Sequence, residues 1–84
     1  MNKKQQKTLH AVFANPVSGT ISWSDIESLL KAVGARMSEG SGSRVRFIYG
    51  TQKATFHRSH PNKEAKEYQV KDAREFLEKI GVKP

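Results

Sequence analysis

The stretch RVRFIYGTQKATFH, residues 44–57, decides the fold because it holds two strand patterns on either side of a turn signal. Apolar and polar side chains alternate over 44–49, as expected for a strand with one buried face. Gly50 and Thr51 follow, and a glycine at the first central position is typical of a two-residue hairpin turn. The sequence therefore predicts antiparallel strands over 44–49 and 52–57.

The turn also fixes the register of this hairpin, because counting outward from it gives each residue one partner. One face is expected to be apolar, with the pairs Tyr49–Gln52, Phe47–Ala54 and Val45–Phe56. The other face is expected to be polar and basic, with the pairs Arg46–Thr55 and Arg44–His57. Directly opposed residues have Cβ atoms about 5 Å apart. The sequence therefore predicts an arginine next to a histidine on the polar face.

The clearest helical signal lies before the hairpin. Ser22 is a favourable N-cap, and Asp25 three residues later predicts a capping box. Gly34 is expected to end the helix, since glycine is common just after the last turn. Between these residues, apolar side chains recur with helical spacing at Trp23, Ile26, Leu29, Leu30 and Val33. We therefore expect Trp23 to lie in the core, although an indole could also stack on a nucleic-acid base.

Three further elements complete the predicted order. A helix over 3–14 should end at NPVSG, a short strand is expected over 35–39, and a last helix over 68–80. The order is then helix, helix, three antiparallel strands, helix. This order predicts the α+β class, as a two-layer domain with helices on one face of a three-stranded sheet. A chain of 84 residues is expected to form one domain, residues 1–84.

The net charge of the chain is +7, and most of the excess lies near the amino terminus and in residues 35–67. A basic surface of this kind is typical of proteins that bind nucleic acid, although it can also serve only solubility. Cysteine is absent, so no disulfide and no thiolate metal site is expected. No apolar run is long enough for a signal peptide or a membrane span. We expect a cytoplasmic location, no membrane partner, no metal and no small-molecule cofactor.

The segment FHRSHPNKE, residues 56–64, contains the best candidates for chemistry. RNA can be cleaved without a metal by a base, an acid and cations that stabilise the charged phosphorane. Histidine serves as base or acid near neutral pH, which makes His57 and His60 the catalytic candidates. Basic side chains bind phosphate, and glycine lets a backbone approach closely. The candidate RNA-binding residues are Arg44, Arg46, Arg58, Lys53, Lys63, Gly42 and Ser43.

Two other interpretations of the histidines stay open. The spacing of His57 and His60 would suit half of a zinc site, but further ligands are lacking, and no metal site is expected. Both histidines would otherwise be ordinary residues at a strand end.

The order of SWSDIESLLKAVGARMSEGSGS, RVRF, FHRSHPNKE and VKDAREFLEKIG is similar to that of the HicA family of toxins from bacterial toxin–antitoxin pairs. The resemblance spans about residues 22–81. It implies a fold similar to a double-stranded-RNA-binding domain, and an endoribonuclease (mRNA interferase) activity that arrests translation. It also implies RNA as a partner and neutralisation by a HicB-type antitoxin. The single HicA-like domain would comprise an N-terminal helix and turn, 1–20, and a core, 21–84.

The chain departs from the family pattern at one position that matters for catalysis. Members commonly carry histidine directly after the glycine–serine pair, where this chain has Arg44. An arginine stays protonated and cannot act as a base. Either catalysis is carried out by His57, across the hairpin, or the chain is a degenerate toxin that binds RNA without cutting it. A structural accessory protein that binds ribosomal RNA is a third possibility.

Overall fold

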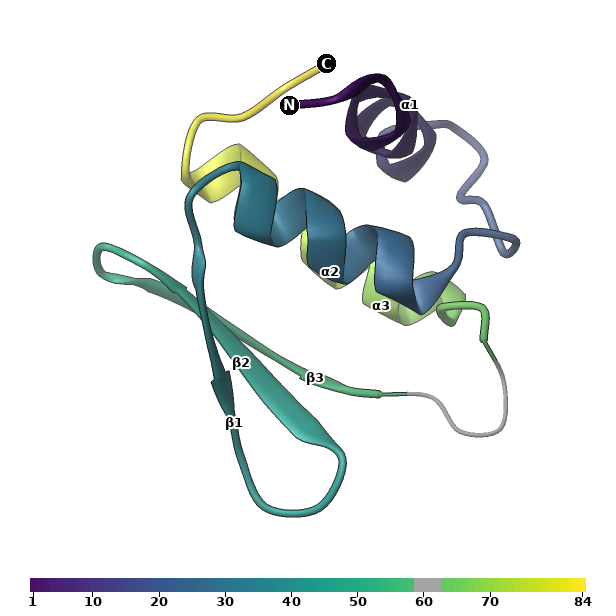
Figure 1. Ribbon diagram of the computed structural model, residues 1–84. Helices are drawn as coiled ribbons and strands as arrows, with labels where there is room; N and C mark the ends of the chain where they lie inside the picture. The colour runs from purple at the N-terminus through teal and green to yellow at the C-terminus, as the bar shows by residue number, and fades with distance from the viewer. Residues whose placement is uncertain (59–62) are drawn as a thin grey trace.

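The computed structural model describes residues 1–58 and 63–84. Three strands form one antiparallel sheet in the order β1-β2-β3, and helices cover one of its faces (Figure 1). The elements are α1 (Lys3–Val12), α2 (Trp23–Ala32), β1 (Arg36–Glu39), β2 (Arg44–Tyr49), β3 (Gln52–His57) and α3 (Glu67–Lys79). The α+β class and the order predicted from the sequence are confirmed.

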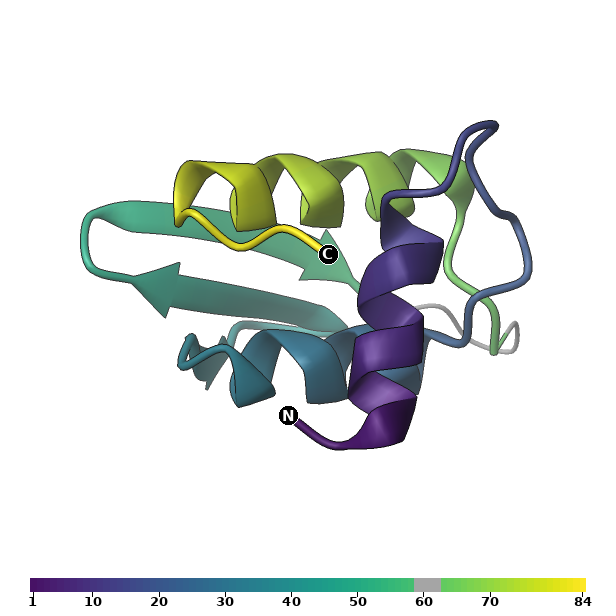
Figure 2. The same ribbon diagram turned by 90° about the horizontal axis from the view of Figure 1, so that it is seen from above.

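The two core helices, α2 and α3, run along the sheet, and α1 crosses them on the side away from the sheet (Figure 2). The helices α1 and α3 each differ from the predicted bounds by one or two residues at their ends. Within the residues that the structure describes, no helix has the length and apolar character needed to cross a membrane.

The hairpin has the predicted register at every position. Arg44 pairs with His57, Arg46 with Thr55, and Phe47 with Ala54. Gly50 has φ +60°, a conformation that glycine adopts without steric cost. The turn therefore sets which side chains face the helices and which face away from them.

The α2 helix ends as predicted but begins differently. Gly34, at φ +103°, follows the last turn, and the N–H of Ala35 donates to the carbonyl of Leu30 (3.1 Å), as in a Schellman motif. The capping box predicted for Ser22 and Asp25 is wrong. The Ser22 hydroxyl bonds that of Ser24 (2.8 Å) instead of a backbone N–H.

Backbone pairing takes the place of the missing cap. Ser22 forms an antiparallel bridge with Glu64, so the Trp23 N–H donates to the Lys63 carbonyl (2.8 Å). In the same bridge the N–H of Ala65 donates to the carbonyl of Ile21 (2.8 Å). The first turn of α2 is thereby joined to the chain that follows the sheet.

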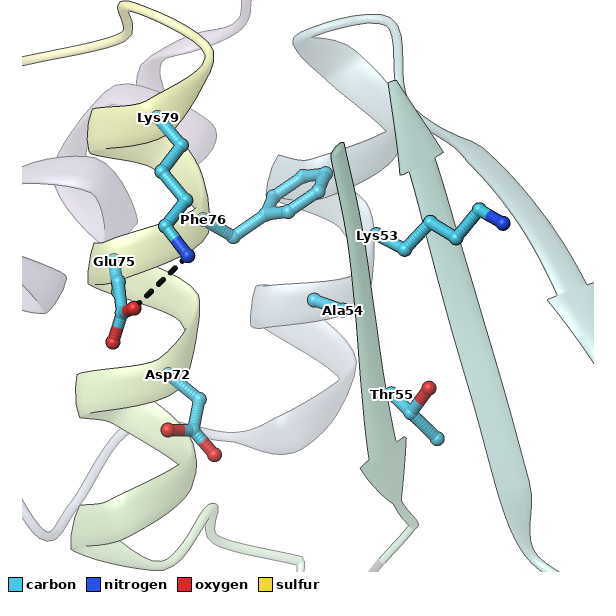
Figure 3. A pocket seen from close by; sticks show the side chains of 7 residues that line it. All are labelled: Lys53, Ala54, Thr55, Asp72, Glu75, Phe76 and Lys79. Atoms are coloured by element: carbon cyan, nitrogen blue, oxygen red, sulfur yellow. Dashed lines mark ion pairs between the residues drawn. The ribbon is translucent and has the colours of Figure 1, made fainter. Parts of the chain in front are cut away.

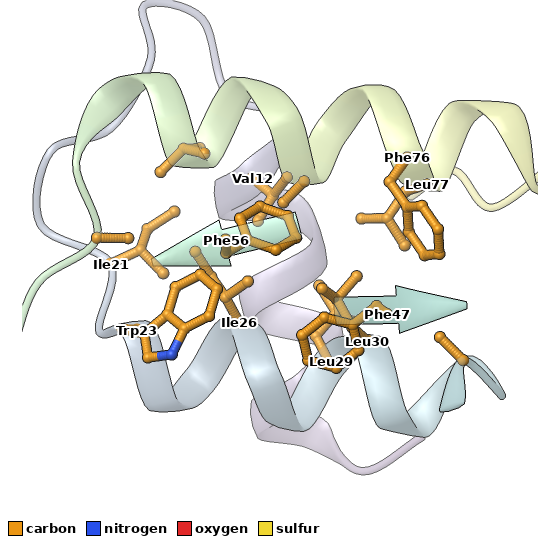
Figure 4. Close-up of a cluster of buried hydrophobic side chains, with 14 of the residues drawn as sticks. Val12, Ile21, Trp23, Ile26, Leu29, Leu30, Phe47, Phe56, Phe76 and Leu77 are labelled. Carbon is orange, nitrogen blue, oxygen red and sulfur yellow. The ribbon is translucent and has the colours of Figure 1, made fainter. Parts of the chain in front are cut away.

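The core lies between the sheet and the helices (Figure 4). Its sheet side is made by Val45, Phe47 and Phe56, which are almost fully buried. Trp23 is 6% exposed, and its ring centroid lies 5.1 Å from that of Phe56. The prediction that Trp23 belongs to the core is confirmed. Because Phe56 precedes His57, this packing also anchors the end of β3 that carries the histidine.

Candidate nucleic-acid interface

The sheet face that points away from the helices is basic. Alternation along the strands places eight side chains on it: Arg36, Ser38, Arg44, Arg46, Ile48, Lys53, Thr55 and His57. We call these eight residues the open face. In Figure 3, Lys53 and Thr55 point away from α3, whereas Ala54 points towards the helix side. The open face carries four permanent cations and a histidine, and it has no acidic side chain.

The cations of the open face are not neutralised within the described residues. The ion pairs found there join Lys4 to Asp25, Lys79 to Glu75, and Arg58 to Glu27 and to Glu39. All of them lie outside the open face. A surface with several cations that have no ion-pair partner attracts polyanions.

The loop between β1 and β2 borders this face and is firmly held. Gly42, at its tip, has φ +66°, which permits the turn. The Gly40 N–H donates to the Arg44 carbonyl (2.9 Å), and the Arg58 N–H donates to the Ser43 carbonyl (2.9 Å). The loop is thus bonded to the first residue of β2 and to the residue that follows β3.

A hollow of about 350 Å³ lies between this loop and the open face. Its lining residues are Ser38, Glu39, Gly40, Ser41, Arg44, Val45, Arg46 and Thr55. Arg44 and Arg46 provide the guanidinium donors, and serine and threonine hydroxyls add neutral donors. Guanidinium and hydroxyl groups are the donors that commonly bind phosphate oxygens.

His57 is the last residue of β3 and lies at one end of the open face. Its side chain is exposed, and its partner across the hairpin is Arg44. The carbonyl of His57 accepts a hydrogen bond from Nε2 of Gln69 on α3 (2.6 Å), and Gln69 is 1% exposed. The helix therefore fixes the backbone of His57 and leaves the imidazole accessible to a ligand.

Neither Gln69 nor Arg36 is among the site residues predicted from the sequence. Gln69 is a polar residue within the apolar stripe of α3, which was the available signal that its amide meets a specific partner. Arg36 alternates with the half-buried Met37 and pairs with Ile48, so the same alternation that located Arg44 and Arg46 extends to it.

Arg58 is held away from the open face by two carboxylates. Its Nε donates to Oε1 of Glu27 on α2 (2.7 Å), and its Nη1 donates to Oε1 of Glu39 on β1. The indole Nε1 of Trp23 donates to the same Glu27 oxygen (2.7 Å). The hydrogen bond with Glu27, followed by that with Glu39, raises the pKa of Arg58 above its ordinary value, against the effect of desolvation. Arg58, predicted as a phosphate ligand, is placed by the structure in a network that joins α2 to β1.

Two other predicted site residues are not part of the open face. Lys63 is exposed, and its carbonyl belongs to the bridge that starts α2. His60 lies outside the described residues. The structure brings together Arg44, Arg46, Lys53 and His57, with Gly42 and Ser43 in the adjoining loop.

A comparison with protein-family models identifies the family. Residues 23–82 match the family described as "HicA toxin of bacterial toxin-antitoxin". The match covers more than half of the chain, from the first residue of α2 to beyond α3, so this protein belongs to the HicA toxin family. Comparisons with curated proteins and with solved structures gave no match.

The Arg58 network predicts a stability difference between two arginines. Arg58→Ala should lower the free energy of unfolding by about 1–3 kcal/mol, because the carboxylate of Glu27, only 17% exposed, loses a charged partner. Arg46→Ala, on the open face, should change it by less than about 0.5 kcal/mol. Urea unfolding followed by the fluorescence of Trp23 measures both. Equal losses for the two variants would show that the network does not stabilise the fold.

Proposed function

We propose that this HicA-family protein is a toxin that binds mRNA on its open face and cleaves it by metal-independent acid–base chemistry. It acts in the cytoplasm, arrests translation and is neutralised by a HicB-type antitoxin. Residues 1–84 work as one domain. One observation carries this proposal: four cations and an exposed histidine share one face of the sheet, and none of the four forms an ion pair within the described residues.

The proposed reaction is an internal transfer at phosphorus. The 2′-hydroxyl oxygen of RNA attacks the adjacent phosphorus, and the bond from phosphorus to the 5′-oxygen breaks. A base takes the 2′-hydroxyl proton, and an acid donates a proton to the leaving 5′-oxygen. The products are a 2′,3′-cyclic phosphate and a 5′-hydroxyl, so no water or metal enters this step.

The open face supplies groups for each part of this reaction. His57 acts as the base or acid, because its imidazole is exposed and an imidazole can accept or donate a proton. Arg44, its cross-strand partner, donates to the non-bridging phosphate oxygens, where charge develops. Arg46 and Lys53 hold neighbouring phosphates. His60 remains a secondary candidate for the proton transfers.

A second function, RNA binding without cleavage, is favoured by one specific observation. Arg44 occupies the position where HicA toxins commonly have histidine, and a guanidinium does not accept protons at neutral pH. RNA binding without cleavage needs the same cationic face, and it differs from the first function only because no cleavage product forms. A cleavage assay therefore separates the two.

The antitoxin is expected to be acidic over the surface that covers the open face. Blocking that face would remove both the phosphate ligands and His57 from RNA. Charge complementarity with Arg36, Arg44, Arg46 and Lys53 would also make the association fast and sensitive to salt.

The catalytic assignment predicts the effect of one histidine substitution. His57→Ala should reduce RNA cleavage by about a hundredfold to ten-thousandfold, the usual effect of losing a general acid or base, with the RNA dissociation constant within a few-fold of the parent. His10→Ala, an exposed histidine on α1, is the matched control and should cleave at the parent rate. Cleavage by the parent should persist in EDTA. A His57→Ala protein that cleaves at the parent rate would refute the assignment.

The binding assignment predicts how affinity responds to salt. RNA affinity of the parent should fall steeply between low and moderate salt, because binding releases counterions. Arg46→Ala should weaken binding of different RNA sequences by a similar factor and reduce the slope of log affinity against log salt by about 1. Lys79→Ala removes the same charge from α3, where Lys79 is paired with Glu75, and should leave the slope unchanged. Affinity that is independent of salt would contradict phosphate binding.

A further inference from the structure

The backbone of β3 has alternating hydrogen-bonding directions that follow from the hairpin. In a two-residue hairpin the residues flanking the turn, here Tyr49 and Gln52, exchange both hydrogen bonds. The N–H and C=O groups of Gln52, Ala54 and Phe56 therefore point to β2. Those of Lys53, Thr55 and His57 point to the outer edge of the sheet.

Two hydrogen bonds at the far end of the hairpin agree with this assignment. Arg58 is next in phase with Phe56, and its N–H donates inward to the Ser43 carbonyl (2.9 Å). His57 is in phase with Thr55, and its carbonyl accepts from Gln69 of α3, outside the β2 ladder (2.6 Å). The outer edge at His57 is thus already bonded to the protein.

The outer edge at Lys53 and Thr55 is different. Within residues 1–58 and 63–84, the N–H groups and carbonyls of Lys53 and Thr55 have no hydrogen-bond partner on this outer edge. A groove of about 170 Å³ lies between this edge and α3 (Figure 3). Its lining residues are Lys53, Ala54, Thr55, Asp72, Glu75, Phe76 and Lys79. An open strand edge next to a helix is the geometry in which proteins accept an extended peptide as an added strand.

We propose that this groove binds an extended segment of the antitoxin, which adds to β3 as a fourth strand. The proposal rests on the function proposed above and specifies how the partner is held. Two N–H donors and two carbonyl acceptors, from Lys53 and Thr55, supply the backbone pairing. They fix the register of the segment in the same way that β2 fixes that of β3.

The chemistry of the two sides of the groove specifies the side chains of this segment. Side chains on the open-face side lie next to Lys53, whose cross-strand row includes Arg36, and next to Thr55, whose partner is Arg46. Acidic residues are therefore favoured there. Side chains on the helix side face Ala54 and Phe76 and lie beside Asp72 and Glu75 of α3. These carboxylates disfavour another acid, so small or apolar residues are expected there. The expected segment therefore alternates acidic residues with small or apolar ones.

The same charges disfavour a second copy of this chain as the occupant. Pairing two β3 edges would join two open faces into one sheet, each with four cations and no acid. Like charges across neighbouring strands destabilise such a sheet. RNA has no regular series of donors and acceptors that matches a strand edge, so its phosphates bind the side chains of the open face instead.

Amide hydrogen exchange followed by NMR tests the proposal without any substitution. The probe is the antitoxin encoded with this toxin, added to saturation. In the free toxin the amides of Lys53 and Thr55 should exchange quickly and those of Ala54 and Phe56 slowly, because only the latter are bonded to β2. In the complex, Lys53 and Thr55 should become about as protected as Ala54.

The outcomes separate this proposal from the function on which it rests. If the antitoxin blocks RNA cleavage while Lys53 and Thr55 still exchange quickly, strand addition is wrong and the proposed function stands. If the protein neither binds nor cleaves RNA, the proposed function is wrong, whatever the exchange measurement shows. The free toxin could instead show both amides protected, with protection that grows with protein concentration and a doubled molecular mass. This result would identify a second copy as the occupant and overturn the proposal.

A backbone substitution provides an independent test of the same contact. Thr55→Pro removes an outward N–H, which an edge strand tolerates, together with the side-chain hydroxyl, and should weaken antitoxin affinity by about tenfold or more. Thr55→Val loses the same hydroxyl but keeps the N–H, so it is the matched control and should bind the antitoxin more tightly than Thr55→Pro. Equal affinities for the two variants would contradict strand addition. If Thr55→Pro does not fold, the exchange measurement decides alone.

Discussion

The two-residue period of the hairpin is the constraint on which the rest of the structure depends. A shift of the pairing by one residue would exchange the two faces and place Arg44 and Arg46 against the helices. Burying unpaired guanidinium groups costs far more than the fold can supply, and the core would lose Val45 and Phe47. The cationic face is therefore a consequence of the same alternation that builds the core.

Charges on the two sides of the sheet have different roles. On the helix side, Arg58 is bonded to Glu27 and Glu39, so its charge serves the packing of α2 against β1. On the open face, Arg44 and Arg46 form no ion pair within the described residues and remain available to an anion. The helix α3 connects the two sides, because Gln69 holds the backbone of His57 from the covered layer while the imidazole stays exposed.

Local patterns determine most of the fold, which explains why the sequence predicts it well. The hairpin register, the helix end at Gly34 and the pairing of Arg44 with His57 all depend on residues close together or on strict alternation. The features that the sequence does not predict involve distant partners. The predicted cap at Ser22 is replaced by a bridge to Glu64, and Arg58 meets a carboxylate 31 positions away. Composition indicates that a charge exists, but pairing depends on which elements the fold brings together.

The central claim is that the open face is where RNA binds. An NMR titration with a 2′-O-methyl RNA oligonucleotide tests it directly, since this analogue lacks the 2′-hydroxyl nucleophile and stays intact. The account predicts that the largest shifts occur at Arg36, Arg44, Arg46, Lys53 and His57, including the arginine side-chain N–H signals, and that they fade at high salt. Shifts concentrated on α1 and the outer side of α3, with the open face unchanged, would contradict it.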